Sequence, residues 1–150
     1  MKLAVFFAAL VWLGGAGAPS AADNSPVGTW VSEGQAGGRP MTMTIARWGI
    51  PNTRLIYSAS PDGAVATVAD RLDGNDSPVV VAGMPTRATI SLTLDDELHA
   101  TALSKVSARP VGISKWAFSP DFKTLTIEHD FIQPAGGIPA GQSVETWTRQ

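Results

Sequence analysis

The chain has 150 residues, no cysteine, and 11 basic against 13 acidic side chains. Without cysteine, the protein can form no disulfide and carry no cysteine-linked lipid, so its stability must come from a buried core. The basic residues are scattered singly, whereas a groove that follows nucleic-acid phosphates needs them clustered. We therefore expect no nucleic-acid partner.

The first 22 residues have the layout of a secretory signal peptide. One positive charge precedes an apolar run over residues 3–13, which is shorter than the about 20 residues that a membrane-spanning helix needs. Glycines and a proline follow over residues 14–19, and small residues lead up to Ala22. We expect cleavage after Ala22, a single domain over residues 23–150, periplasmic or secreted localisation, and no membrane anchor after cleavage.

The rest of the chain consists of short apolar or alternating runs, separated by turn residues about every ten positions. This spacing is typical of an all-β sandwich or barrel. In the clearest run, residues 87–94, apolar and polar side chains alternate, and Asp95-Asp96 then turns the chain into a weaker run at residues 98–102. Alternation gives a strand one buried and one solvated face, so the two runs predict a hairpin.

Two other segments show the same period of two. Trp116 and Phe118 precede the turn at residues 119–122, and apolar residues then alternate over residues 125–131, which predicts a second hairpin. Over residues 41–48 the alternation changes phase at Arg47, which is typical of a bulge or a strand end.

Trp30 and Arg149 stand near the two ends of the mature sequence, in Gly28-Thr29-Trp30 and in Thr146-Trp147-Thr148-Arg149. An early Gly-x-Trp with a late Arg resembles the lipocalins and related calycin barrels. That resemblance implies that Trp30 closes the barrel floor and that Arg149 packs across its ring, where a guanidinium gains a cation–π contact.

Other motifs resemble a group of small secreted bacterial proteins of unknown function, whose patterns are DGKDYPVxG, SPDGKTLT and a terminal v-x-v-y-x-R. The matching stretches here are residues 73–79, 83–85, 119–126 and 144–150. The chain departs from the pattern at Phe122, where the group has glycine. Because a bulky residue resists a positive φ, the turn must use another geometry or accept local strain. The group has no established activity to carry over.

The chain has two histidines, His99 and His129. His99 shares the polar face of its strand and is interpreted as solvated. His129 shares the face of Leu125, Ile127 and Phe131, which would direct it inward as a hydrogen-bonding anchor or, as in nitrobindin-type barrels, as a haem ligand. The flanking Glu128 and Asp130 favour the other interpretation, an exposed ion pair.

Acidic residues gather at Asp70, Asp73 and Asp76, with Asn75 between them. Calcium takes six to eight oxygen ligands, but the spacing does not fit the helix-loop-helix calcium pattern, and these residues are common turn formers. No nucleophile elbow or phosphate-binding loop is present. We expect no metal, no cofactor and no catalytic residue.

These patterns together predict an all-β, antiparallel up-and-down β-barrel of lipocalin or calycin type, with a β-sandwich as the alternative. Barrels of eight or more strands can hold one small ligand. We expect a non-enzymatic protein that binds a small apolar ligand in the barrel. One alternative is a structural or interaction protein with a solid barrel, which acts through loops at residues 34–40 or 134–141. Another alternative is a hydrolase or haem-binding barrel that uses His129. The predicted pocket residues are Ile45, Tyr57, Ile90, Leu92, Trp116, Phe118 and His129, and the predicted floor residues are Trp30 and Arg149.

Overall fold

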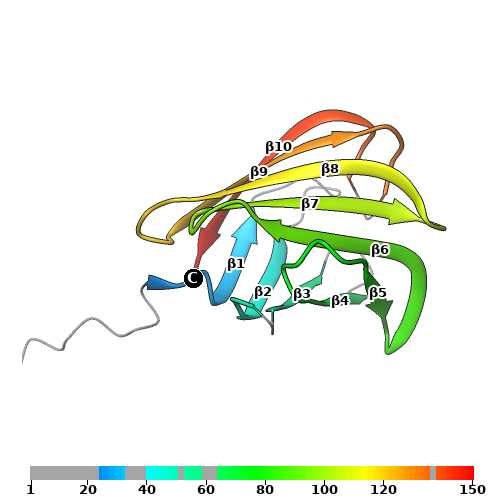
Figure 1. Ribbon diagram of the computed structural model, residues 1–150. Helices are drawn as coiled ribbons and strands as arrows, with labels where there is room; N and C mark the ends of the chain where they lie inside the picture. Colours follow the sequence, from blue (N-terminus) through cyan, green and yellow to red (C-terminus); the bar gives the residue numbers. More distant parts are fainter. Residues whose placement is uncertain (1–23, 33–39, 51–52, 59–63, 136–137) are drawn as a thin grey trace, which may run out of the picture.

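Ten strands make up the described part of the computed structural model (Figure 1). Residues 24–32, 40–50, 53–58, 64–135 and 138–150 are described, with only the backbone for residues 55–58. The predicted signal peptide, residues 1–22, lies outside the described residues. The strands are β1 (Gly28–Ser32), β2 (Met41–Arg47), β3 (Thr53–Ser58), β4 (Val65–Asp70), β5 (Ser77–Val81), β6 (Met84–Leu94), β7 (His99–Val106), β8 (Arg109–Phe118), β9 (Thr124–Phe131) and β10 (Gly141–Arg149).

The sheet closes on itself. Each strand pairs antiparallel with its neighbours along the chain, and β1 pairs with β10, so the topology is an up-and-down barrel. The end of β10 lies beside the start of β1 (Figure 1), and Trp30 pairs with Arg149 across this seam. The predicted fold class is confirmed, and closure of all ten strands into one sheet excludes the sandwich. Among the described residues, no helix has the length and hydropathy of a membrane span.

The alternation in the sequence corresponds to the inside and outside of the barrel. In β9, Leu125, Ile127, His129 and Phe131 are buried, whereas the residues between them are exposed or half-buried. Both predicted hairpins are present, as β6–β7 and β8–β9. The predicted bulge is also present, because the β2–β3 register shifts between Ile45 and Arg47.

An aromatic cluster fills one end of the barrel, and we call it the aromatic floor. The ring of Phe118 lies at its centre, with ring centroids of Trp30, Trp48, Phe122 and Trp116 at 5.6, 5.3, 5.8 and 6.4 Å. The interplanar angles of 52–79° avoid face-to-face stacking, as the quadrupoles of aromatic rings favour. The floor therefore closes this end with packed side chains.

The segment before β1 is tied to the rim of the aromatic floor. The indole Nε1 of Trp30 donates to the carbonyl of Pro26 at 3.0 Å, and the Arg149 guanidinium donates to the carbonyl of Ser25 at 3.1 Å. A Cβ at Gly28 would lie 3.0 Å from Nε of Arg149. Glycine at this position therefore lets the last strand place its arginine directly over the first.

The turn between β8 and β9 keeps the left-handed geometry that glycine would favour. Phe122 has a φ of 51° and is buried against Phe118. Of the two expectations for this turn, local strain is the one that applies. A left-handed conformation costs roughly 1–2 kcal/mol for a residue with a Cβ. Burial of an aromatic ring in the floor offsets that cost.

Asp121 in the same turn has a pKa below its ordinary value of 3.8, mainly because the Ser119 hydroxyl donates to its carboxylate at 2.7 Å, and further because the Lys123 amide donates at 3.1 Å. A lowered pKa means that the ionised carboxylate stabilises the folded state above about pH 4, and that this contribution is lost as pH falls through the folded pKa.

We expect Ser119→Ala to raise the pKa of Asp121 toward 3.8, which an NMR titration of the carboxyl carbons would measure. Asp96 serves as the internal control. Its pKa is also lowered, chiefly by the amide of Leu98, and it should titrate as in the unsubstituted protein. An unchanged Asp121 titration would show that Ser119 does not hold this carboxylate.

A bulge at the far end of β8 shapes the interior next to the site described below. The β7–β8 register shifts between Ser104 and Lys105, which leaves Val111 as an extra residue on β8. Val111 and Gly112 are both buried as a result. The ring of Phe131 lies across Gly112, where an added Cβ would come within 2.4 Å of it. Only glycine lets Phe131 occupy this place.

Candidate functional site

A cavity of about 160 Å³ lies inside the barrel. Of the five rings of the aromatic floor, only Trp116 lines it. Most of the wall is apolar: Met41, Met43, Val68, Val79, Ala88, Ile90, Ala102, Val106, Val111, Trp116, Ile127, Phe131, Ala135, Ile138 and Trp147. The polar residues of the wall are Thr89, Ser104, Lys105, His129 and Glu145.

The size of the cavity limits its occupant. Drug-sized ligands occupy pockets of roughly 300–1,000 Å³, whereas an apolar cavity of about 150 Å³ holds one benzene. At about 160 Å³ the cavity matches a molecule with roughly six carbon atoms. Because this cavity is present, side chains do not fill the whole interior, as the solid-barrel alternative from the sequence would require.

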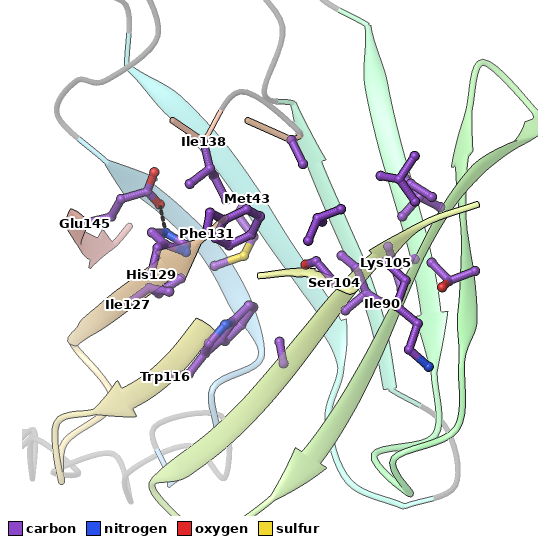
Figure 2. A pocket seen from close by; sticks show the side chains of 18 of the residues that line it. Met43, Ile90, Ser104, Lys105, Trp116, Ile127, His129, Phe131, Ile138 and Glu145 are labelled. Carbon is purple, nitrogen blue, oxygen red and sulfur yellow. Dashed lines mark ion pairs between the residues drawn. The ribbon is translucent and has the colours of Figure 1, made fainter. Parts of the chain in front are cut away.

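Three adjacent strands bring a polar group into this apolar wall. Ser114 on β8 pairs directly with His129 on β9, and Ser143 on β10 pairs with the other side of His129. Glu145 and Trp147 follow at two-residue intervals on β10, so they share the inward face. Figure 2 shows the Glu145 carboxylate beside the His129 ring, next to Phe131 and Met43.

The four side chains form a chain of polar contacts. Nδ1 of His129 lies 2.8 Å from the Ser114 hydroxyl oxygen, and Nε2 of His129 lies 3.3 Å from Oε2 of Glu145. The indole Nε1 of Trp147 donates to the same Oε2 at 3.2 Å. We call Ser114, His129, Glu145 and Trp147 the polar network.

The polar network is almost completely buried. The His129 and Glu145 side chains are 4% and 9% exposed, and a buried carboxylate is costly unless partners compensate its charge. Histidine and tryptophan provide those partners here. The rings of His129 and Phe131 also pack in a T-shaped arrangement, with centroids 5.8 Å apart.

One atom of the polar network lacks a hydrogen bond. Although Nε2 of His129 is within ion-pair distance of Glu145, it is not in hydrogen-bond geometry with any atom. Among the described residues, only Thr89 Oγ1 is a second buried side-chain polar atom without a partner. Both residues line the cavity. Unpartnered buried polar atoms are rare in folded proteins and require an explanation.

The structure divides the residues predicted from the sequence into two sets. Ile90, Trp116 and His129 line the cavity. Ile45, Leu92 and Phe118 do not: they face inward but are buried in the packed core nearer the aromatic floor. The Tyr57 side chain lies outside the described part of the chain, as do residues 34–39 and 136–137 of the two predicted loops.

The interpretation of His129 as an exposed ion pair is wrong. Glu128 and Asp130 point to solvent, whereas His129 faces the interior between them. The other histidine, His99, is exposed as expected, and its Nδ1 lies 2.7 Å from Asp96. The sequence reasoning missed Ser114 and Glu145. Glu145 lies two residues before the inward Trp147, so the alternation along the strand would have predicted that Glu145 also faces inward.

Ser114, His129 and Glu145 are the residue types of a hydrolase triad, but their placement does not suit a nucleophile. Ser114 lies in the middle of β8, is paired on both sides, and does not line the cavity. A nucleophile must reach the substrate carbonyl. In this structure the Ser114 hydroxyl instead fixes the orientation of the His129 ring.

A haem does not fit the cavity. A volume that matches one benzene ring cannot take a macrocycle of four pyrrole rings. The ring nitrogen that would bind iron, Nε2 of His129, also lies 3.3 Å from a carboxylate oxygen. The residues around His129 therefore do not fit a haem.

The acidic cluster seen in the sequence does not converge on one point. Asp70 is buried and accepts the backbone amides of Leu72 at 2.6 Å and Leu92 at 3.4 Å. Asp73 accepts the amide of Asn75 within its own turn, and Asp76 pairs with Lys105 at 2.8 Å. No group of three or more acidic or histidine side chains in the described ranges could hold a metal ion.

Comparisons with known proteins identify no relative of this chain. No family model, no curated protein and no solved structure matches it. The calycin-like resemblance thus depends on the closed barrel and on the placement of Trp30 and Arg149. A functional assignment must come from the chemistry of the cavity.

Proposed function

We propose that this protein is an exported, calycin-like barrel that binds one small, largely apolar molecule in its interior without transforming it. One observation carries the proposal. Among the described residues, two buried side-chain polar atoms lack a hydrogen-bond partner, and both belong to residues that line the apolar cavity of about 160 Å³. Apolar walls with a few convergent polar groups are the general form of a small-molecule site.

Binding is favoured over catalysis because of how the polar network is arranged. The serine that could act as a nucleophile does not line the cavity, and its hydroxyl is bonded to Nδ1 of His129. The carboxylate that could act as a base already accepts the Trp147 indole N–H. Export is supported by the signal-peptide pattern of residues 1–22.

The test is a thermal unfolding experiment on residues 23–150 with compounds of increasing size, from benzene through toluene and indole to naphthalene. A ligand at about 100 times its Kd stabilises the folded state by about 2.7 kcal/mol. For a domain of this size, that free energy raises the Tm by roughly 5–10 °C. We expect benzene and toluene to give such a shift and naphthalene to give none.

A pair of alanine substitutions provides the control. Ala102 is buried and lines the cavity, so Ala102→Leu should fill part of the volume and abolish the shift. Ala69→Leu adds the same atoms at an exposed position on β4 and should leave the shift unchanged. If no compound stabilises the unsubstituted protein, or if Ala102→Leu responds equally well, the proposal is wrong.

A further inference from the structure

The unpartnered Nε2 of His129 is a hydrogen-bond donor, because of the carboxylate beside it. An ionised carboxylate only accepts hydrogen bonds, and Oε2 of Glu145 lies 3.3 Å from this nitrogen. A bare nitrogen lone pair 3.3 Å from that negatively charged oxygen would be repelled. The proton therefore sits on Nε2, and in the neutral ring the Ser114 hydroxyl donates to Nδ1 across the 2.8 Å contact. His129 and Glu145, which both line the cavity, thus combine one N–H donor that has no partner with one carboxylate acceptor.

We infer that the ligand of this cavity carries a single hydroxyl group, which accepts a hydrogen bond from Nε2 of His129 and donates one to the Glu145 carboxylate. This inference rests on the proposed function and names the ligand class. A hydroxyl is the smallest group that is donor and acceptor at once. Both contacting residues line the cavity and are at least nine-tenths buried.

Other polar groups match the wall less well. A ligand carboxylate would lie against Glu145, and like charges in a site of low dielectric repel strongly. A ligand ammonium brings three donors, but most of the wall around Glu145 is apolar. The one cationic side chain of the wall, Lys105, is held by Asp76 at 2.8 Å. The cavity volume leaves room for about six carbon atoms besides the hydroxyl, which describes a phenol or a short alcohol.

The experiment compares ligands that differ in one group, by calorimetry or by NMR titration of the mature protein. Phenol and toluene have nearly the same shape, and phenol should bind about 10- to 100-fold more tightly, as expected for hydrogen bonds to charged partners. Benzyl alcohol should likewise bind more tightly than benzylammonium, which has nearly its shape, and more tightly than benzoate.

Two substitutions locate the hydroxyl. Glu145→Gln keeps the side-chain shape but removes the charged acceptor, so the preference for phenol over toluene should fall to less than about 10-fold. Glu128→Gln makes the same change at an exposed position on β9 and should leave the preference unchanged, whereas Thr89→Val tests the other unpartnered polar atom of the wall. Loss of the preference in Thr89→Val and not in Glu145→Gln would place the hydroxyl elsewhere and overturn the inference.

The outcomes separate the two proposals. If toluene binds as tightly as phenol or more tightly, or if a charged compound binds best, the hydroxyl inference fails while interior binding stands. If none of the compounds binds, the proposed function fails with it. A preference for phenol over toluene that falls only in Glu145→Gln supports both.

Discussion

Phe118→Ala is expected to lower the free energy of unfolding by about 3–5 kcal/mol, the range for removing a large aromatic side chain from a packed core. Phe118 is 4% exposed, and its ring contacts the other four rings of the aromatic floor. Without it, the surrounding rings would face a void, and each aromatic pair lost removes about 0.5–1.5 kcal/mol beyond the buried area. Urea unfolding of residues 23–150 would measure the difference.

Phe118→Leu is the matched control, because it keeps an apolar side chain at the same place. We expect a smaller loss, of about 1–1.5 kcal/mol, since the floor can partly close around leucine. Equal effects of the alanine and leucine substitutions would indicate that the ring contacts contribute little. A loss below about 1 kcal/mol for Phe118→Ala would show that this end of the barrel is not packed as described.

His129→Leu is expected to be comparably damaging, at about 3–5 kcal/mol, for an electrostatic reason. Removal of the polar partner of a buried carboxylate leaves the carboxylate without compensation. The Glu145 carboxylate, 9% exposed, would keep the Trp147 indole but lose the histidine 3.3 Å away. The Ser114 hydroxyl would also lose its 2.8 Å partner. Chemical unfolding at neutral pH would measure the loss.

Two variants test whether this cost comes from burial of the pair. In His129→Leu/Glu145→Leu no charge remains to be buried, and much of the lost stability should return, because apolar replacements of buried pairs are often neutral. His99→Leu removes an exposed histidine that also lies beside a carboxylate, Asp96, and should have a much smaller effect because exposed pairs contribute little. If His99→Leu and His129→Leu have equal effects, the interior position of His129 is wrong.

The cavity connects these stability effects to binding. The aromatic floor leaves the interior above it only partly filled, and the bulge in β8 with Phe131 over Gly112 sets one wall of the remaining volume. The polar network then lies in that wall. A ligand that satisfies Nε2 of His129 should therefore also stabilise the fold, since it binds only the folded state.

The sequence by itself was enough to predict the all-β fold, the two hairpins and the bulge at Arg47. It also showed that His129 shares the parity of Leu125, Ile127 and Phe131, but the flanking acidic residues favoured an exposed position, which was wrong. Each of these patterns depends on side chains pointing alternately to opposite faces of a strand, which is a property of neighbouring residues. The same rule would have placed Glu145 on the inward face with Trp147. It could not show that Glu145, Ser114 and His129 are neighbours, because that depends on the register between strands.

Only the tertiary structure decided which inward residues surround the cavity. Ile45, Leu92 and Phe118 have the same parity as their cavity-lining neighbours but lie nearer the aromatic floor. Their depth follows from the tilt and stagger of the strands around a closed barrel, which alternation within one strand does not encode. The volume of about 160 Å³ is likewise the space left after distant side chains have packed against one another.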